Sequence, residues 1–114
     1  MLRYPELPES ERDLSSDIDG WLTMVSRNRA AWLAALSAHD PDVRAVVDAA
    51  RDEAVERLVA RFGDRSLRPV LRAYSAFAEQ ATVEWLVRGR LPRAQVHELL
   101  LTTLTHLTGG DPPP

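Results

Sequence analysis

Apolar side chains recur at helical spacing along most of this chain, most clearly between residues 66 and 108. Apolar positions three and four residues apart fall on one face of a helix, so the pattern predicts two long helices. Gly89 can take the left-handed conformation that ends the first, and Pro92 suits the first turn of the second. Residues 66–108 are therefore predicted to form an antiparallel helical hairpin. Its inward-facing residues are predicted to be Val70, Leu71, Tyr74, Phe77, Ala78, Ala81, Trp85, Val96, Leu99, Leu100, Thr103, Leu104 and Leu107.

Each hairpin helix also carries a second stripe of small and aliphatic side chains. Such a stripe allows two helices to approach closely, and it indicates that two copies of the hairpin meet in a four-helix bundle. The alternative is ordinary surface alanine and valine, because apolar atoms are common on any protein surface. The predicted dimer-interface residues are Ala76, Gln80, Val83 and Val87 in the first helix and His97, Leu101, Leu104 and Thr108 in the second.

The chain before the hairpin begins with a polar stretch. Residues 1–16 are acidic and contain Pro5 and Pro8, which break regular structure, so they are predicted to be a flexible lead-in. The first helical stretch starts at residue 17, with apolar positions from Ile18 onward. It is predicted to break near Asn28, which can cap a short second helix. The alternative is an unbroken helix with an inward-pointing polar group.

The next helix has clear boundary signals. Asp40 is a good helix cap, Pro41 a good first helical residue, and Gly63 ends the segment. Residues 17–108 are predicted to form one helical domain, and residues 109–114, with two glycines and three prolines, a disordered tail. The apolar residues predicted to share one face of this middle helix are Val43, Val46, Val47, Ala50, Ala54, Leu58 and Phe62.

Composition supports an all-α fold of about five helices, an orthogonal or antiparallel bundle that ends in the hairpin. The chain has 114 residues, enough for one domain, and its lack of cysteine excludes disulfides. All 14 basic residues are arginine, the formal net charge is −3, and no basic run indicates nucleic-acid binding. No segment reaches the ~20 apolar residues of a membrane span, and no signal peptide is evident. We therefore expect a cytoplasmic protein.

No pattern in the chain indicates catalysis or metal binding. The three histidines are His39, His97 and His106, and no two have the spacing that places metal ligands on one helix face. The carboxylates are predicted to lie on solvent-exposed helix faces and at helix caps. No glycine-rich loop or nucleophile elbow is present. The sequence predicts no enzyme, no metal and no cofactor.

Aromatic side chains are the most distinctive feature of the predicted interior. One interpretation is ordinary core packing. The other is an apolar pocket between helices, in which a few polar groups orient a small apolar molecule. The residues predicted to line such a pocket are Trp21, Met24, Asn28, Trp32, Tyr74, Phe77, Thr82 and Trp85.

Four segments together resemble the C-terminal domain of tetracycline-repressor-like (TetR family) transcriptional regulators. They are residues 32–36 (Trp-Leu-Ala-Ala-Leu), 40–44 (Asp-Pro-Asp-Val-Arg), 74–77 (Tyr-Ser-Ala-Phe) and 84–91 (Glu-Trp-Leu-Val-Arg-Gly-Arg-Leu). The likeness extends from about Asp17 to Leu107. Its most specific fragment is the Trp-Leu-x-x-Gly-x-Leu stretch at the hairpin turn, although the motif is loose.

The resemblance implies an all-helical domain that binds an effector and dimerises through its last two helices. It also implies a pocket for a small, usually apolar ligand in the helices before them. The DNA-binding head of the family has no counterpart here, because no helix-turn-helix precedes the predicted helices. We therefore expect no DNA binding by this chain alone. The competing interpretation is a small helical module that dimerises or binds a partner protein without any small-molecule ligand.

Overall fold

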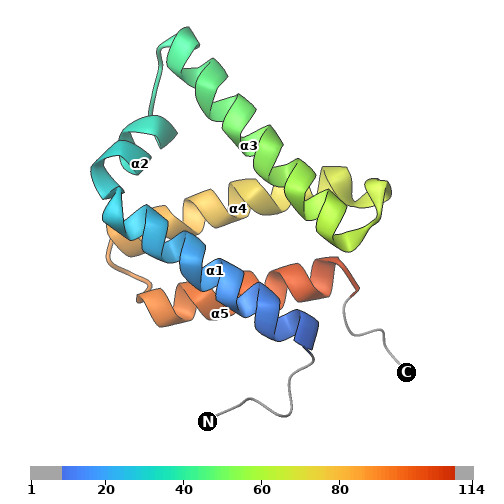
Figure 1. The fold of residues 1–114 in the computed structure, drawn as a ribbon. Helices are drawn as coiled ribbons and strands as arrows, with labels where there is room; N and C mark the ends of the chain where they lie inside the picture. Colours follow the sequence, from blue (N-terminus) through green and yellow to red (C-terminus); the bar gives the residue numbers. More distant parts are fainter. Residues whose placement is uncertain (1–8, 110–114) are drawn as a thin grey trace.

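The computed structural model describes the backbone of residues 9–109 and the side chains of residues 13–109. In this part of the chain all regular structure is helical, and the prediction of an all-α fold with five helices is confirmed. In Figure 1, α1 and α3 lie over one side of the hairpin formed by α4 and α5, with α1 along α5 and α3 along α4. The elements are α1 (Glu9–Arg27), α2 (Arg29–Leu36), α3 (Pro41–Phe62), the 3-10 turn η1 (Arg65–Leu67), α4 (Arg68–Leu86) and α5 (Arg93–Leu107).

The first helix begins earlier than predicted. We placed residues 1–16 in a lead-in, but residues 9–16 belong to α1. The physical reason is Leu14, which lies one helical turn before Ile18 on the same face and is buried in the same core. The predicted apolar stripe began at Ile18 and therefore did not include Leu14. Residues 1–8, and residues 110–114 of the predicted tail, lie outside the described part of the chain.

The predicted break at Asn28 is confirmed, since α1 ends at Arg27 and α2 begins at Arg29. Asn28 does not cap α2 with its side chain, however. Its amide group donates a hydrogen bond back to the carbonyl oxygen of Met24 at 2.8 Å. This bond ties the junction to the last turn of α1, and α2 leaves in a new direction.

The boundaries of α3 follow the predicted signals. The Asp40 carboxylate accepts hydrogen bonds from the backbone N–H groups of Asp42 (2.8 Å) and Val43 (3.3 Å). Gly63 ends the helix with a φ of 67°, a left-handed conformation that costs glycine little. Asp64 then caps η1 by accepting from the N–H of Ser66, so α4 starts at Arg68 rather than at Ser66.

The prediction of a single apolar face along α3 is wrong. Val55 and Val59 are buried, but Val43 and Val46 are 43% and 70% exposed. The residue one turn before Val55, on its face, is Arg51, which binds across to α4. The apolar stripe of the first half is thus rotated away from that of the second half, and only the second half of α3 packs into the core.

The core lies where α1, the second half of α3 and the hairpin meet. Leu22, Leu71 and Leu100 come from three different helices, and each is at most 1% exposed. The α4–α5 turn is closed by the N–H of Arg90, which donates to the carbonyl oxygen of Glu84 at 2.9 Å, and Gly89 has a φ of 63°. The predicted helical hairpin and its glycine turn are confirmed.

Candidate dimer face and ligand groove

Two of the predicted pocket aromatics pack on each other. The rings of Trp21 and Trp32 meet edge to face, with centroids 5.4 Å apart. The indole N–H of Trp32 donates to the hydroxyl of Thr82 at 2.8 Å, and that hydroxyl donates to the carbonyl oxygen of Glu79 at 2.6 Å. Buried indole N–H groups need a partner, and this one finds it within the chain.

Tyr74 and Phe77 form a second, separate pair. Their ring centroids lie 6.3 Å apart, and the buried Tyr74 hydroxyl donates to the carbonyl oxygen of Leu100 at 2.8 Å. Tyr74 therefore fastens α4 to α5. Trp85 is partly buried farther along α4, where the guanidinium of Arg93 lies 6.0 Å from its ring centroid.

The structure does not place all the predicted pocket residues inside. Met24 and Phe77 are 42% and 40% exposed, and Asn28 is also exposed, so their predicted interior position is wrong. The buried line of α4 runs through Leu71, Tyr74 and Ala78, and Phe77 lies one residue, or about 100° around the helix, from Ala78. None of the eight predicted pocket residues lines either of the two best-formed hollows on the described surface.

The hollow with the more aliphatic lining is instead a groove between α2 and α4, which we call the α2–α4 groove. It is open to solvent and has a volume of about 370 Å³. All four residues predicted for the dimer interface on α4 line it, because α2 approaches α4 on that flank. The lining residues are Leu33, Leu36, Ser37, Ala76, Glu79, Gln80, Val83 and Val87.

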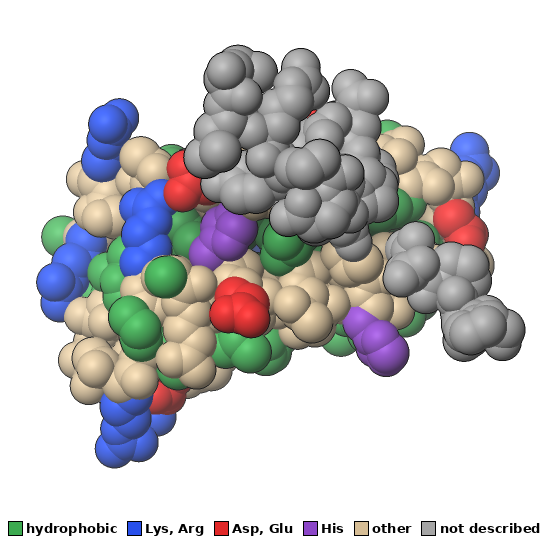
Figure 2. Space-filling model, turned by 90° about the horizontal axis from the view of Figure 1, so that it is seen from below, with side chains coloured by type: hydrophobic (Ala, Val, Ile, Leu, Met, Phe, Trp, Pro, Cys, Tyr) green, Lys and Arg blue, Asp and Glu red, His purple; other side chains and the backbone are tan. Residues whose placement is uncertain are grey.

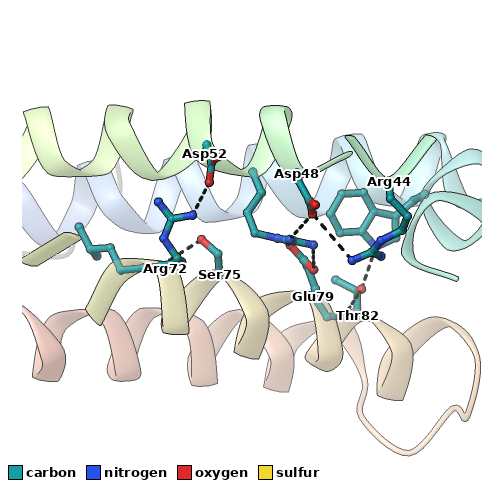
Figure 3. Close-up of polar contacts among 10 residues, drawn as sticks. Arg44, Asp48, Asp52, Arg72, Ser75, Glu79 and Thr82 are labelled. Atoms are coloured by element: carbon teal, nitrogen blue, oxygen red, sulfur yellow. Dashed lines mark hydrogen bonds and ion pairs between the residues drawn. The ribbon is translucent and has the colours of Figure 1, made fainter. Parts of the chain in front are cut away.

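The Glu79 carboxylate at the edge of this groove is bound by Arg51, a residue of α3. Arg51 donates to both oxygens of the Glu79 carboxylate, at 2.6 and 2.8 Å, and to Asp48 at 3.0 Å. Asp48 and Glu79 face one another across the α3–α4 interface in Figure 3. Hydrogen bonding to Glu79 raises the pKa of Arg51. Two-point binding of this kind fixes geometry as well as charge, so Glu79 is held in place at the groove edge.

Further ion pairs continue along the same interface. Arg72 pairs with Asp52, and Arg68 binds both oxygens of Glu56 at 2.6 and 2.7 Å. These pairs are solvent-exposed, so each adds little to the stability of the fold. They lie along the exposed edge of the α3–α4 interface, beside the buried Val55.

The prediction for the α5 half of the dimer interface is wrong. Leu104 is 2% exposed, and Leu101 packs against the core. The Nε2 atom of His97 lies 2.9 Å from the carbonyl oxygen of Ser15 in α1, so Nε2 donates there. Thr108 caps the end of α5 by donating to Leu104. The reason is α1, which covers this stripe from within the same chain.

The uncovered side of the hairpin carries a different set of residues. α1 covers the His97 side of α5 and α3 covers the Glu79 side of α4, and no helix within residues 9–109 covers the opposite flanks. Figure 2 views the molecule from below, and in the described part of its middle hydrophobic, histidine and uncharged side chains surround one acidic side chain. We call the uncovered flank the outer face. Its exposed residues are Ala73 and Phe77 on α4 and Gln95, Leu99, Thr102 and His106 on α5.

Sequence reasoning assigned Phe77 and Leu99 to the interior and so missed this face. Both belong to apolar runs, and Leu99 is followed by two more leucines. One signal was present in the sequence. The polar residues Gln95, four before Leu99, and Thr102 and His106, three and seven after it, share its helix face, which marks Leu99 as the apolar member of a solvent-facing flank.

Comparison with protein-family models, curated proteins and solved structures finds no match to this chain. The TetR-like relationship therefore stays a prediction from the sequence. Among the side chains of residues 13–109, no three from His, Cys, Asp or Glu gather as a metal site would require. None of the helices in this part of the chain combines the length and apolar character needed to cross a bilayer.

Proposed function

We propose that this chain is a homodimerising regulatory module of the kind found in TetR-like repressors. Two copies associate through the outer faces of their α4–α5 hairpins to form a four-helix bundle. A small apolar molecule binds each copy in the α2–α4 groove. The observation that carries the proposal is the uncovered outer face, on which Phe77 and Leu99 are 40% and 36% exposed.

The composition of the outer face supports association with a second copy. Around Phe77 and Leu99 it has alanine, threonine and glutamine, side chains that allow close helix packing, and Glu98 lies at its edge. The Phe77 ring packs against the Tyr74 ring, and Leu99 is next to Leu100 in the sequence. Both therefore adjoin the hydrogen bond from the Tyr74 hydroxyl to the Leu100 carbonyl oxygen, which joins α4 to α5. Rigid apolar anchors of this type dominate the binding energy of protein interfaces.

The size and the lining of the α2–α4 groove make it our candidate ligand site. Its volume of about 370 Å³ falls within the ~300–1,000 Å³ typical of small-molecule sites. Leu33, Val83 and Val87 provide apolar contact, while Ser37 and Gln80 can orient a polar group. The alternative, a dimerising or protein-interaction module with no ligand, shares the outer face but leaves this groove empty.

The dimer is tested by placing charges on the outer face. The native chain should be a dimer by sedimentation equilibrium at about 50 µM, and Phe77→Glu with Leu99→Glu should make it a monomer, because carboxylates of both copies would be buried together. Circular dichroism should show unchanged helix content, since both residues are exposed. Val43→Glu with Val46→Glu on α3 adds the same charge elsewhere and should leave the dimer intact. A native monomer at this concentration would refute the dimer.

The ligand site is tested separately by thermal unfolding with indole, naphthalene and decanol. A compound that binds only the folded chain raises the melting temperature, and at about 100 times its Kd it adds about 2.7 kcal/mol of stability. Ala76→Trp fills the α2–α4 groove and should remove the rise, whereas Ala49→Trp on the exposed side of α3 should keep it. A rise that survives Ala76→Trp would place the binding elsewhere, and no rise with any compound would favour the ligand-free alternative.

A further inference from the structure

Five arginines gather at the end of the molecule where α1 meets α2 and α4 turns into α5. We call this end the arginine tip. Figure 2 shows basic side chains grouped at that end of the surface. They come from two segments more than fifty residues apart in the sequence, which is why no basic run was visible. The residues are Arg27, Arg29, Arg88, Arg90 and Arg93.

Two contacts hold these segments together. The guanidinium of Arg29 donates to the carbonyl oxygen of Leu86 at 2.5 Å, which joins the α1–α2 junction to the last turn of α4. Arg93 donates to the Asp19 carboxylate and to the Thr23 hydroxyl, each at 2.8 Å, which joins the start of α5 to α1. The tip is therefore a built surface of the fold, not a flexible tail.

The charge of the tip is not balanced locally. Of its five arginines, Arg93 pairs with Asp19 and Arg88 with Glu84, so three positive charges remain (5 − 2 = 3). Among the described residues, no carboxylate lies within ion-pair distance of Arg27, Arg29 or Arg90. Along α3 and α4, by contrast, nearly every arginine has an acidic partner. The whole chain has a net charge of −3, so the excess at the tip is specific to it.

We propose that the arginine tip binds a short acidic segment of a partner protein. Guanidinium groups bind carboxylates through two parallel hydrogen bonds, and clusters of them recognise acidic and phosphorylated peptides. The same segments of the tip expose apolar side chains, with Met24 at 42% and Val87 at 58%. A partner segment that mixes acidic and apolar residues matches both features.

The charge of the rest of the molecule selects a short segment over an extended polyanion. DNA or an anionic membrane presents phosphates over a wide area, and these would also meet surfaces on which acidic residues outnumber arginines. A short peptide contacts the tip alone, where the potential is positive, and distant carboxylates are screened beyond the Debye length of about 8 Å at physiological salt. The tip does not overlap the outer face, and it shares only Val87 with the α2–α4 groove.

The experiment measures binding of a fluorescein-labelled helical peptide of about 15 residues built from glutamate, leucine and alanine. Fluorescence anisotropy with the full chain should show saturable binding that weakens as salt is raised. Arg27→Gln with Arg90→Gln should weaken it roughly tenfold, since two charge contacts to the peptide carboxylates are lost. Neither arginine has an ion-pair partner among the described side chains, so the fold should be unchanged.

The matched control is Arg57→Gln with Arg65→Gln, which removes the same charge far from the tip and should leave peptide affinity within about twofold. A lysine-for-glutamate version of the peptide should not bind. Equal weakening by both double variants would overturn the proposal, because it would mean that only net charge matters. Tighter binding of duplex DNA or phosphatidylserine vesicles than of the peptide, lost in the tip variant, would also overturn it in favour of an extended polyanion.

Discussion

Leu100→Ala should lower the free energy of unfolding by about 3–5 kcal/mol. Leu100 is 1% exposed at the centre of α5, and its removal leaves a cavity where three helices meet. Its backbone carbonyl also accepts the Tyr74 hydroxyl, so local relaxation into the cavity is restrained. Urea unfolding followed by circular dichroism would measure the loss.

The neighbouring leucine provides the control. Leu99 is 36% exposed, so Leu99→Ala should cost less than about 1 kcal/mol when the protein is dilute enough to be monomeric. The two substitutions are chemically identical and adjacent in sequence. Equal losses for Leu99→Ala and Leu100→Ala would contradict the placement of Leu100 in the core and of Leu99 on the outer face.

Raising the pH above about 10 should destabilise the fold by about 1.4 kcal/mol for each pH unit, through Tyr74. Burial raises the pKa of the Tyr74 phenol well above its ordinary value. In this range the unfolded chain loses the phenolic proton while the folded chain keeps it. The unfolded state therefore binds fewer protons, and stability, fully present below pH 10, falls as the pH rises. Unfolding free energies measured by urea between pH 8 and 12 would show the slope.

Tyr74→Phe is the matched variant for this effect. It removes the titrating group and should abolish the alkaline slope, at a cost of about 1 kcal/mol near pH 8 for the lost hydrogen bond to Leu100. The chain contains no lysine, so no lysine side chain titrates in the same pH range. An unchanged slope in Tyr74→Phe would show that another group, such as Tyr4 outside the described residues, is responsible.

The parts of the fold that depend on local chemistry were predictable from the sequence. Asp40 and Pro41 start α3, Gly63 ends it, and Gly89 closes the hairpin turn, each because its side chain or its backbone freedom suits one position in a helix boundary. Such signals act over a few residues and need no knowledge of the rest of the chain. The break at Asn28 belongs to the same class.

The candidate site was less predictable, because both helices of the hairpin have more than one apolar flank. Periodicity identifies the flanks but not which helix will cover each one. On α5 the stripe through His97 and Leu104 has the spacing of a dimer interface, but α1 of the same chain packs against it. Leu14 and Ile18 of α1 gain a buried partner there, and Leu99 is left facing outward.

Sequence alone thus determined that this chain is all-helical, where most of its helices begin and end, and that it closes with a hairpin. Tertiary structure alone decided the outer face, the α2–α4 groove and the arginine tip. The physical reason is the distance along the sequence over which the deciding contacts act. Helix boundaries are set by contacts within one turn, whereas the contact of Arg29 with Leu86 joins residues 57 apart in the sequence. Nothing in the local pattern around Arg27 or Arg90 indicates that these two side chains share one end of the molecule.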